Sequence, residues 1–285
     1  MPELPADVIP RAYIVRGGLP RMVFPDFAWV GGCSNSSAWP GPVSKRRPIT
    51  HEPCLAYVIL GATKTLMVDT GHFAHWYSLE GQLEAVLQGR TLDYVFPSHQ
   101  EIPHSGNLGR LLHKYPKAVA VGDVRDYHLF HPEVALHRLV PMKHGERLDL
   151  GDREFVVLDA IWKDLSGSMW AYDTRRKLLF TADGFGYIHL HEANACGTML
   201  HEMSAEQVKQ ATDRPALPFT GMELRDQPAR VAAFRALMAR YPIEIIAGGH
   251  TAPIMGPVLQ PTIEKLLATI AENKTGAAFL QTSPR

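Results

Sequence analysis

The loop with the most evident chemical potential contains His99, Glu101 and His104, in the segment Phe-Pro-Ser-His-Gln-Glu-Ile-Pro-His-Ser-Gly-Asn. The apolar run 92–96 before it predicts a short buried strand, and the apolar spacing in 107–115 predicts a helix after it. Imidazole and carboxylate groups two and three residues apart on one loop can converge on a metal ion, or on a close pair of ions. The alternative is a solvated loop that is rich in His and Glu.

Three other potential ligands stand at the ends of predicted strands. Asp69 lies in an Asp-Thr-Gly turn, Asp183 is followed by glycines, and His250 follows two glycines. In α/β proteins, ligand-binding groups are concentrated in the loops at strand ends. A strand-end Asp, a His-rich loop, a second strand-end Asp and a strand-end His, in this order, make the solvated loop the weaker interpretation.

As an ordered set, these motifs resemble the metallo-β-lactamase superfamily over roughly residues 50–256, and most closely the β-lactamase-like domain of flavodiiron proteins. The loop of that family reads H-x-E-x-D-H-x-G, and its bridging aspartate stands in a motif like L-F-S-x-D-x-F-G. The matching residues here are His99, Glu101, His104, Gly106, Asp183 in Leu-Phe-Thr-Ala-Asp-Gly-Phe-Gly, and His250. The resemblance implies the α/β fold of that superfamily, an αββα sandwich of two mixed sheets flanked by helices, with the active site along one edge.

The resemblance also implies two divalent metal ions, which could be iron, zinc or manganese. The first would be bound by His99, Glu101, Asp164 and one oxygen of Asp183. Asp164 stands where the family has its middle histidine in the ungapped alignment, which we prefer; a slipped alignment puts Ile161-Trp162 there and loses the ligand. A set with three carboxylates and one imidazole suits iron or manganese better than zinc.

The second metal ion would be bound by His104, His250 and the other oxygen of Asp183. Pro103 replaces the aspartate that the family carries in its loop, and it offers no side-chain ligand atom, so we expect this second site to be weakened. Two histidines that follow Asp183 either supply a substitute ligand or are surface or pocket residues: His189 and His191.

Two carboxylates are the expected catalytic residues. Asp183 would bridge the metal ions and manage protons. Asp69 stands at the usual strand-end turn of the fold, where we expect it to orient the histidine loop through backbone contacts, with acid–base work as the alternative.

The elements that must position these residues follow from local patterns. Apolar residues in 22–30 predict one strand near the N-terminus. Ser78 is expected to cap a helix that Gly89 ends, and Thr262 is expected to cap the last helix. We expect one domain over 1–285, with strands and a loop in 1–50 and a helix and tail in 257–285.

Composition excludes several classes of partner. The 285 residues include 29 basic and 29 acidic side chains, so nothing indicates binding to nucleic acid or to a membrane surface. No apolar run approaches the roughly 20 residues that span a bilayer. The three cysteines are far apart in sequence, which is typical of thiols in a reducing compartment, and we expect a cytoplasmic protein.

Two classes of chemistry fit the proposed site. We favour a hydrolase, in which metal-bound hydroxide attacks a small ester, lactone or activated ether. The alternative is a flavodiiron-like diiron protein that binds or reduces dioxygen or nitric oxide. Because the sequence ends 35 residues after His250 without the phosphate-binding loop of a flavodoxin domain, the electrons would come from an external donor.

A second alternative is a degenerate subunit of a hetero-oligomer, since two ligand positions are altered. The resemblance further implies a homodimer or a heterodimer that acts on a small-molecule substrate. Glu101 is the distinguishing residue, because zinc hydrolases of this fold usually carry histidine at that position.

Overall fold

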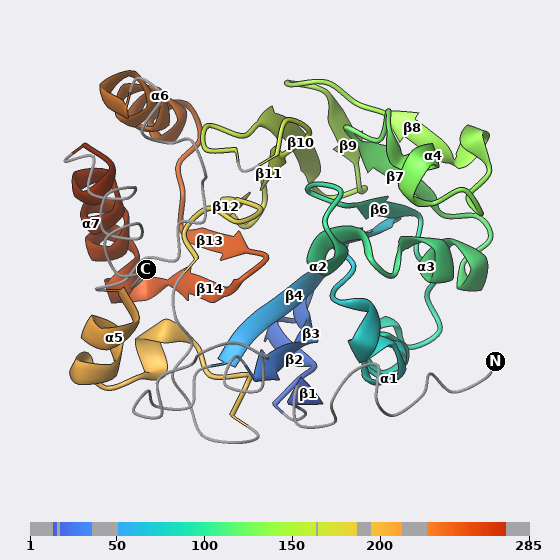
Figure 1. Cartoon of the computed structure of the whole chain (residues 1–285), viewed down its shortest axis with the longest axis horizontal. Helices are drawn as coiled ribbons and strands as arrows, with labels where there is room; N and C mark the ends of the chain where they lie inside the picture. The colour runs from blue at the N-terminus through green and yellow to red at the C-terminus, as the bar shows by residue number, and fades with distance from the viewer. Residues whose placement is uncertain are drawn as a thin grey trace, which may run out of the picture.

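The computed structural model describes residues 14–15, 18–35, 51–163, 165–186, 195–212 and 227–271. It contains two β-sheets packed face to face, with helices on the outside of the pair (Figure 1). This is the αββα sandwich expected from the sequence. Among the described residues, no helix has both the length and the apolar character needed to cross a membrane.

The first sheet has eight strands in the order β1-β3-β4-β5-β6-β7-β8, with β2 paired to β3. It is mixed: the strands up to β5 pair antiparallel, whereas β5, β6, β7 and β8 are parallel to one another. The strands are β1 (Ile14–Val15), β2 (Arg21–Phe24), β3 (Phe27–Asn35), β4 (His51–Leu60), β5 (Thr65–Val68), β6 (Tyr94–Phe96), β7 (Val119–Gly122) and β8 (Leu139–Pro141).

The second sheet has six strands in the order β14-β13-β12-β11-β10-β9. Only β12 and β13 pair parallel within it. The strands are β9 (Arg147–Asp149), β10 (Glu154–Asp159), β11 (Met169–Asp173), β12 (Leu178–Phe180), β13 (Ile245–Gly248) and β14 (Thr251–Met255).

Helices cover the outer faces of the sandwich, with α1 and α3 on the side of the first sheet and α6 and α7 on the side of the second (Figure 1). In α1, Leu79, Leu83 and Val86 recur at helical spacing and are buried against the sheet. The helices are α1 (Trp76–Leu87), α2 (Ile102–Ser105), α3 (Leu108–Lys114), α4 (Tyr127–Phe130), α5 (Ala205–Thr212), α6 (Gln227–Arg240) and α7 (Leu259–Ala271), with 3₁₀ turns at Phe73–His75, Leu136–Arg138, Leu200–Glu202 and Gly256–Val258.

Aromatic side chains from both sheets fill the space between them. Phe155 of the second sheet contacts Phe96 of the first, with ring centroids 5.2 Å apart. Phe27 stacks on Tyr57 at 5.6 Å, and Tyr57 contacts Phe180 of the second sheet at 5.7 Å. Because these rings are fully buried, they fix the separation and orientation of the two sheets.

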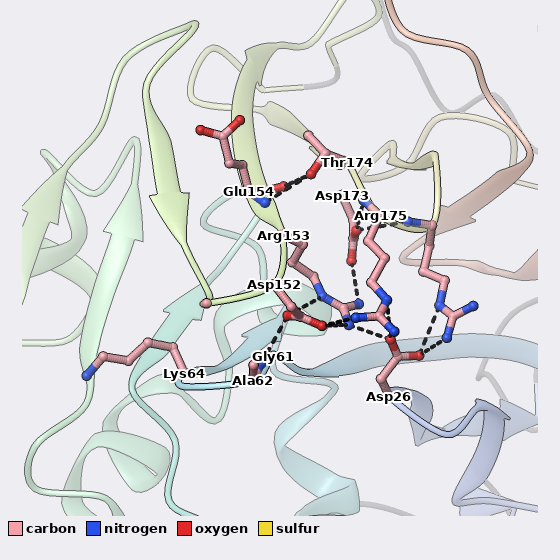
Figure 2. Close-up of polar contacts among 12 residues, drawn as sticks. Asp26, Gly61, Ala62, Lys64, Asp152, Arg153, Glu154, Asp173, Thr174 and Arg175 are labelled. Carbon is pink, nitrogen blue, oxygen red and sulfur yellow. Dashed lines mark hydrogen bonds and ion pairs between the residues drawn. The ribbon is translucent and has the colours of Figure 1, made fainter.

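An ionic cluster joins the sheets at the edge where β5 and β12 begin (Figure 2). Arg153, in the turn between β9 and β10, has a fully buried side chain that pairs with Asp26 and lies 2.9 Å from Asp152 and 3.2 Å from Asp173. Arg176 donates to Asp26 at 2.9 Å. The carboxylates come from turns of both sheets, so the cluster fastens the two layers together.

Three element predictions need correction. The apolar stretch 22–30 forms two strands, β2 and β3, because Pro25 and Asp26 make a tight turn between them. The helix expected from Ser78 starts at Trp76, and the one expected from Thr262 starts at Leu259. Helix α2 was not expected; the proline within it is tolerated because it lies in the first helical turn.

Candidate metal centre

The candidate ligands lie on loops that follow four strands. Asp69 follows β5, His99 follows β6, Asp183 follows β12 and His250 follows β13. Strands β5 and β6 are parallel, and so are β12 and β13, so their carboxyl ends meet at one edge of each sheet. The centre therefore lies at the edge opposite the ionic cluster.

Asp183 is the point where the imidazoles converge. Its Oδ1 lies 2.9 Å from Nε2 of His104 and 3.3 Å from Nε2 of His250. Its Oδ2 lies 3.5 Å from Nε2 of His99. Ligand atoms of His99, His104 and Asp183 all lie within 4.8 Å of one another, and the three residues are buried. The two carboxylate oxygens thus face different histidines.

The histidines on the Oδ1 side are held by their other ring nitrogen. Nδ1 of His104 lies 3.0 Å from Oδ2 of Asp69, and Nδ1 of His250 lies 2.7 Å from the carbonyl oxygen of Pro53. A proton on each Nδ1 is donated to these oxygens, and Nε2 is the nitrogen of each ring that faces Asp183. Carboxylate or carbonyl partners of this kind orient the imidazoles of metal sites.

Asp69 also fixes the backbone of the histidine loop. Its Oδ1 accepts a hydrogen bond of 2.7 Å from the backbone N–H of Ser98. Next to it, the N–H of Thr70 donates to the carbonyl oxygen of His104 at 2.8 Å. These contacts hold the Asp69 turn against the backbone of the histidine loop.

Buried charge explains the protonation of the centre. Burial raises the pKa of Asp183, but the adjacent imidazoles of His104 and His250 outweigh this effect and hold it well below its ordinary value. Burial lowers the pKa of His104, but Asp69 and Asp183 outweigh it and raise the pKa well above its ordinary value. Asp183 therefore stays anionic at the centre of the histidine cluster.

Glu101 occupies the solvent side of the centre. Its Oε2 lies 3.8 Å from Nε2 of His99, and half of its side chain, 52%, is exposed. The contact with His99 lowers the pKa of Glu101 more than partial burial raises it. Glu101 has extended backbone and directly precedes α2, and its side chain makes no capping hydrogen bond to that helix.

Unusual backbone conformations surround the centre. Asp69 has φ = 58°, and Ala182, just before Asp183, has φ = 49°, both in the left-handed region that non-glycine residues rarely adopt. Strained backbone of this kind is concentrated at functional sites. Gly249 has a different role: a Cβ there would overlap the ring of His104, so only glycine lets the His250 loop pack against that imidazole.

Two residues that position the loops were not identified from the sequence. Asn107 donates through Nδ2 to the carbonyl oxygens of Thr70, Gly71 and His72, which fastens the Asp69 turn to the start of α3. Tyr57 donates its hydroxyl proton toward the carbonyl oxygens at 248 and 251, on either side of His250. The Asp-Thr-Gly and His-x-Glu motifs do not indicate that Asn107 or Tyr57 takes part. A polar side chain within an apolar stretch, such as Tyr57, is a general indication of a buried hydrogen bond.

Of the other predicted positions, three are not described by the structure and two are. Asp164, His189 and His191 lie outside the described residues. Pro103 is in the first turn of α2 and contributes no side-chain ligand. Trp162, the residue of the slipped alignment, is buried and packs against aromatic rings: those of Trp170, Phe185 and Phe234.

The fold and this arrangement of imidazoles and carboxylates define a metallo-β-lactamase-like domain. The sequence profile of the ODP family beta lactamase matches residues 53–212, more than half of the chain, and the chain belongs to this family.

Curated relatives share part of this sequence. The chain is 29% identical over 136 residues to an anaerobic nitric oxide reductase flavorubredoxin of Aliivibrio fischeri, which covers 45% of this chain and 27% of that protein. It is 27% identical over 225 residues to diflavin flavoprotein A 1 of Synechocystis sp., which covers 73% of this chain and 34% of that protein. The chain thus spans about a quarter to a third of these relatives.

Solved structures share the fold. The flavodiiron protein from Giardia intestinalis superposes with a TM-score of 0.69 at 15% identity, over 90% of this chain and 60% of that one. Rubredoxin oxygen:oxidoreductase from Desulfovibrio gigas superposes with a TM-score of 0.68 at 18% identity, over 89% and 62%.

The hydrolase expected from the sequence is contradicted by these comparisons. The matched relatives are named for nitric oxide reduction, for diflavin flavoproteins and for the reaction of oxygen with rubredoxin. The hydrolase was predicted because the second metal site has open coordination positions. Any such site can activate water, so openness alone does not separate hydrolysis from redox chemistry.

Proposed function

We propose that the protein holds two iron ions at this centre and binds or reduces dioxygen or nitric oxide with electrons from an external donor. When bound, a ferrous pair supplies both electrons and open coordination positions for a diatomic gas. The proposal is supported by the family membership and by the names of the matched relatives.

The observation that carries the proposal is the division of Asp183 between two sets of histidines. Oδ1 faces His104 and His250, whereas Oδ2 faces His99. A carboxylate can bridge two cations when its oxygens are presented to separate ligand sets, so this geometry fits a pair of ions. Nε2 of His104 and Oδ1 of Asp183 are both buried and lie 2.9 Å apart, so the two ligand atoms are presented to the same point.

The donor set favours iron over zinc. We assign His99, Glu101, Asp183 and Asp164 to one ion, and His104, His250 and Asp183 to the other. Carboxylates are hard ligands that suit iron or manganese, whereas structural zinc sites are rich in thiolate and imidazole. Pro103 supplies no donor, so we expect the ion on the side of His104 and His250 to bind more weakly.

The protein's own residues have three tasks in this scheme. Asp69 and the carbonyl oxygen of Pro53 hold two imidazoles with Nε2 facing Asp183. The aromatic residues Trp162, Trp170 and Phe185 pack behind the Asp183 loop and keep water from that side. Glu101 lies on the solvent side, where a small molecule would enter.

Metal analysis of protein purified with and without oxygen tests the proposal. We expect about two irons per chain in anaerobic protein and a visible spectrum that changes when dioxygen or nitric oxide is added. Asp183→Asn keeps the shape of the side chain but removes its charge, and we expect it to lose most of the iron. Asp159→Asn, at an exposed position on β10, is the matched control and should keep it.

Colourless protein that contains zinc, and whose spectrum does not change with dioxygen or nitric oxide, would refute the proposal. Negligible metal in both preparations, with Asp183→Asn behaving like the parent, would instead favour the degenerate subunit. A homodimer or a heterodimer is part of the proposal, and sedimentation of the purified chain measures its association.

A further inference from the structure

Strand β4 is longer than the strand beside it, β5. The pairing of β4 with β5 runs from Leu60 back to Tyr57, which lies opposite Val68. Before this point, residues 53–56 of β4 pair with β3 on one side and have no partner strand among the described residues on the other. A strand edge of this kind presents its backbone N–H and C=O groups to other parts of the chain.

The turn that carries His250 binds to this edge of β4. The N–H of Leu55 donates to the carbonyl oxygen of Gly249 at 2.9 Å, and the carbonyl oxygen of Pro53 lies 2.7 Å from Nδ1 of His250. Pro53, Leu55 and Tyr57 alternate along β4, so their backbone groups point to the same side of the strand. A turn of the second sheet thus takes the place of β5 along the edge of the first sheet.

Tyr57 lies where β4 passes from β5 to this turn. Its hydroxyl donates to the carbonyl oxygens of Gly248 at 2.8 Å and Thr251 at 3.0 Å, one on each side of His250. The residue is buried between the sheets, with its ring centroid 5.7 Å from that of Phe180. Because the two carbonyl oxygens share this buried donor, loss of the hydroxyl would leave both of them without it.

The other side of the turn contacts the loop of Asp183. The N–H of Gly249 donates to the carbonyl oxygen of Ala182 at 2.7 Å. The turn is therefore held between this loop and β4, and Tyr57 is the side chain of β4 that holds it at both ends. These contacts set the distance of 3.3 Å between Nε2 of His250 and Oδ1 of Asp183.

We propose that Tyr57 is a positioning residue for the ion on the side of His104 and His250; this rests on the proposed function. Its hydroxyl fixes both ends of the turn, so that Nε2 of His250 stays beside Oδ1 of Asp183. Without the hydroxyl, the turn keeps its contacts with the backbone of β4 but relaxes, and the imidazole of His250 moves. The other ion, on the side of His99, does not depend on this turn.

Anaerobic calorimetric titration with ferrous iron tests this role. The wild type should bind two ions in two steps, and the step that is missing from His250→Ala belongs to the ion on that side. Tyr57→Phe keeps the ring and removes the hydroxyl. We expect it to raise the dissociation constant of that step by about 10-fold, as loss of a group that orients a metal ligand does, and to leave the other step unchanged.

Tyr172→Phe is the matched control. Tyr172 is also buried, and its hydroxyl donates to the carbonyl oxygen of Pro242 at 2.6 Å, before β13, whereas His250 follows that strand. Each variant loses one hydrogen bond from a buried tyrosine, so both should lower the urea midpoint of the metal-free protein to a similar extent. Tyr172→Phe should bind iron like the wild type.

Unchanged iron binding by Tyr57→Phe, or equal weakening of both steps, would overturn the positioning role. Weakening of the same step by Tyr172→Phe would also overturn it. A wild type that binds no second ion would refute both this role and the proposed iron pair. Two steps in a wild type whose spectrum does not respond to dioxygen or nitric oxide would refute the gas chemistry alone, and the Tyr57→Phe titration would still decide the positioning role.

Discussion

At the scale of single residues, the centre depends on groups that hold the imidazoles as much as on the imidazoles themselves. Asp69 contacts both Nδ1 of His104 and the backbone N–H of Ser98. One carboxylate therefore sets the tautomer of the imidazole and the path of the loop. Removing the charge of Asp69 changes its contact with His104 but leaves an oxygen that can still accept the hydrogen bond from Ser98.

Asp69→Asn should weaken iron binding by about 10- to 100-fold, because an amide is a poorer acceptor for the Nδ1 proton of His104. The measurement is the dissociation constant for ferrous iron under anaerobic conditions. Asp93→Asn is the control, since Asp93 pairs with Lys64 at the opposite end of β5. Equal iron affinity in Asp69→Asn and wild type would show that Asp69 has no part in the centre.

The convergence of the candidate side chains could be predicted at this scale because each follows a strand and carries a donor side chain. The spacing of His99 and His104 indicated a shared loop, and the structure brings both to Asp183. Asn107 and Tyr57 could not be predicted, because their partners are backbone carbonyl oxygens that any sequence supplies. The prediction of a hydrolase was wrong because the types of ligand side chain indicate which metal binds better than they indicate which reaction it catalyses.

At the scale of elements, the centre depends on how closely the β13–β14 turn approaches α2. Gly249 lies against the ring of His104, and its N–H donates to the carbonyl oxygen of Ala182 at 2.7 Å. Its carbonyl oxygen accepts from the N–H of Leu55 at 2.9 Å. This turn therefore contacts the His104 loop, the Asp183 loop and strand β4.

Gly249→Ala should lower iron content and destabilise the fold, since the added methyl group displaces His104 or the turn. Overpacking of this kind costs about 1–3 kcal/mol. Gly81→Ala is the opposite case: it lies in α1 with open space around it, and we expect it to stabilise by about 0.5–1 kcal/mol. Urea unfolding and iron analysis of both variants measure these effects. An unchanged iron content in Gly249→Ala would contradict the close approach.

Element existence was predictable where apolar spacing was regular, as in α1 and α7. Starts were less predictable, since Trp76 and Leu259 extend the apolar faces of their helices beyond the polar residues taken as caps. Helix α2 has only four residues, too few to display a period.

At the scale of the whole molecule, two polar clusters stand at opposite edges of the sandwich. The ionic cluster around Arg153 is complete within the protein, because three carboxylates surround a fully buried guanidinium. Asp26 and Arg153 are 127 residues apart in sequence, so no local motif predicts that they pair. The fold class was nonetheless predictable, because the ordered motifs specify the sandwich.

Arg153→Met should destabilise the protein by about 3 kcal/mol at pH 7, since it removes the guanidinium that pairs with buried Asp173, while Asp26 keeps Arg176 and Asp152 keeps Arg175. Burial raises the pKa of Asp26, but Arg176 and Arg153 outweigh it and lower the pKa. Such carboxylates stabilise the fold above about pH 4 and lose this effect as the pH falls below it. The difference between variant and wild type should therefore shrink in acid.

Unfolding by urea at pH 7 and pH 3 measures this difference. Arg147→Ala, which removes an exposed pair with Glu154, is the control and should cost less than about 1 kcal/mol. A loss for Arg153→Met no larger than that of the control at pH 7 would show that the cluster does not fasten the sheets.

With the proposed iron pair bound, the placement of Asp183 between histidines of different loops would link iron supply to the lifetime of the protein. His99 and His104 come from the first sheet, whereas Asp183 and His250 come from the second, so an occupied centre would clasp the halves together. A metal ion that binds only the native state adds its binding free energy to the stability of the fold. Chains made during iron starvation would then open more often along that edge and be degraded sooner.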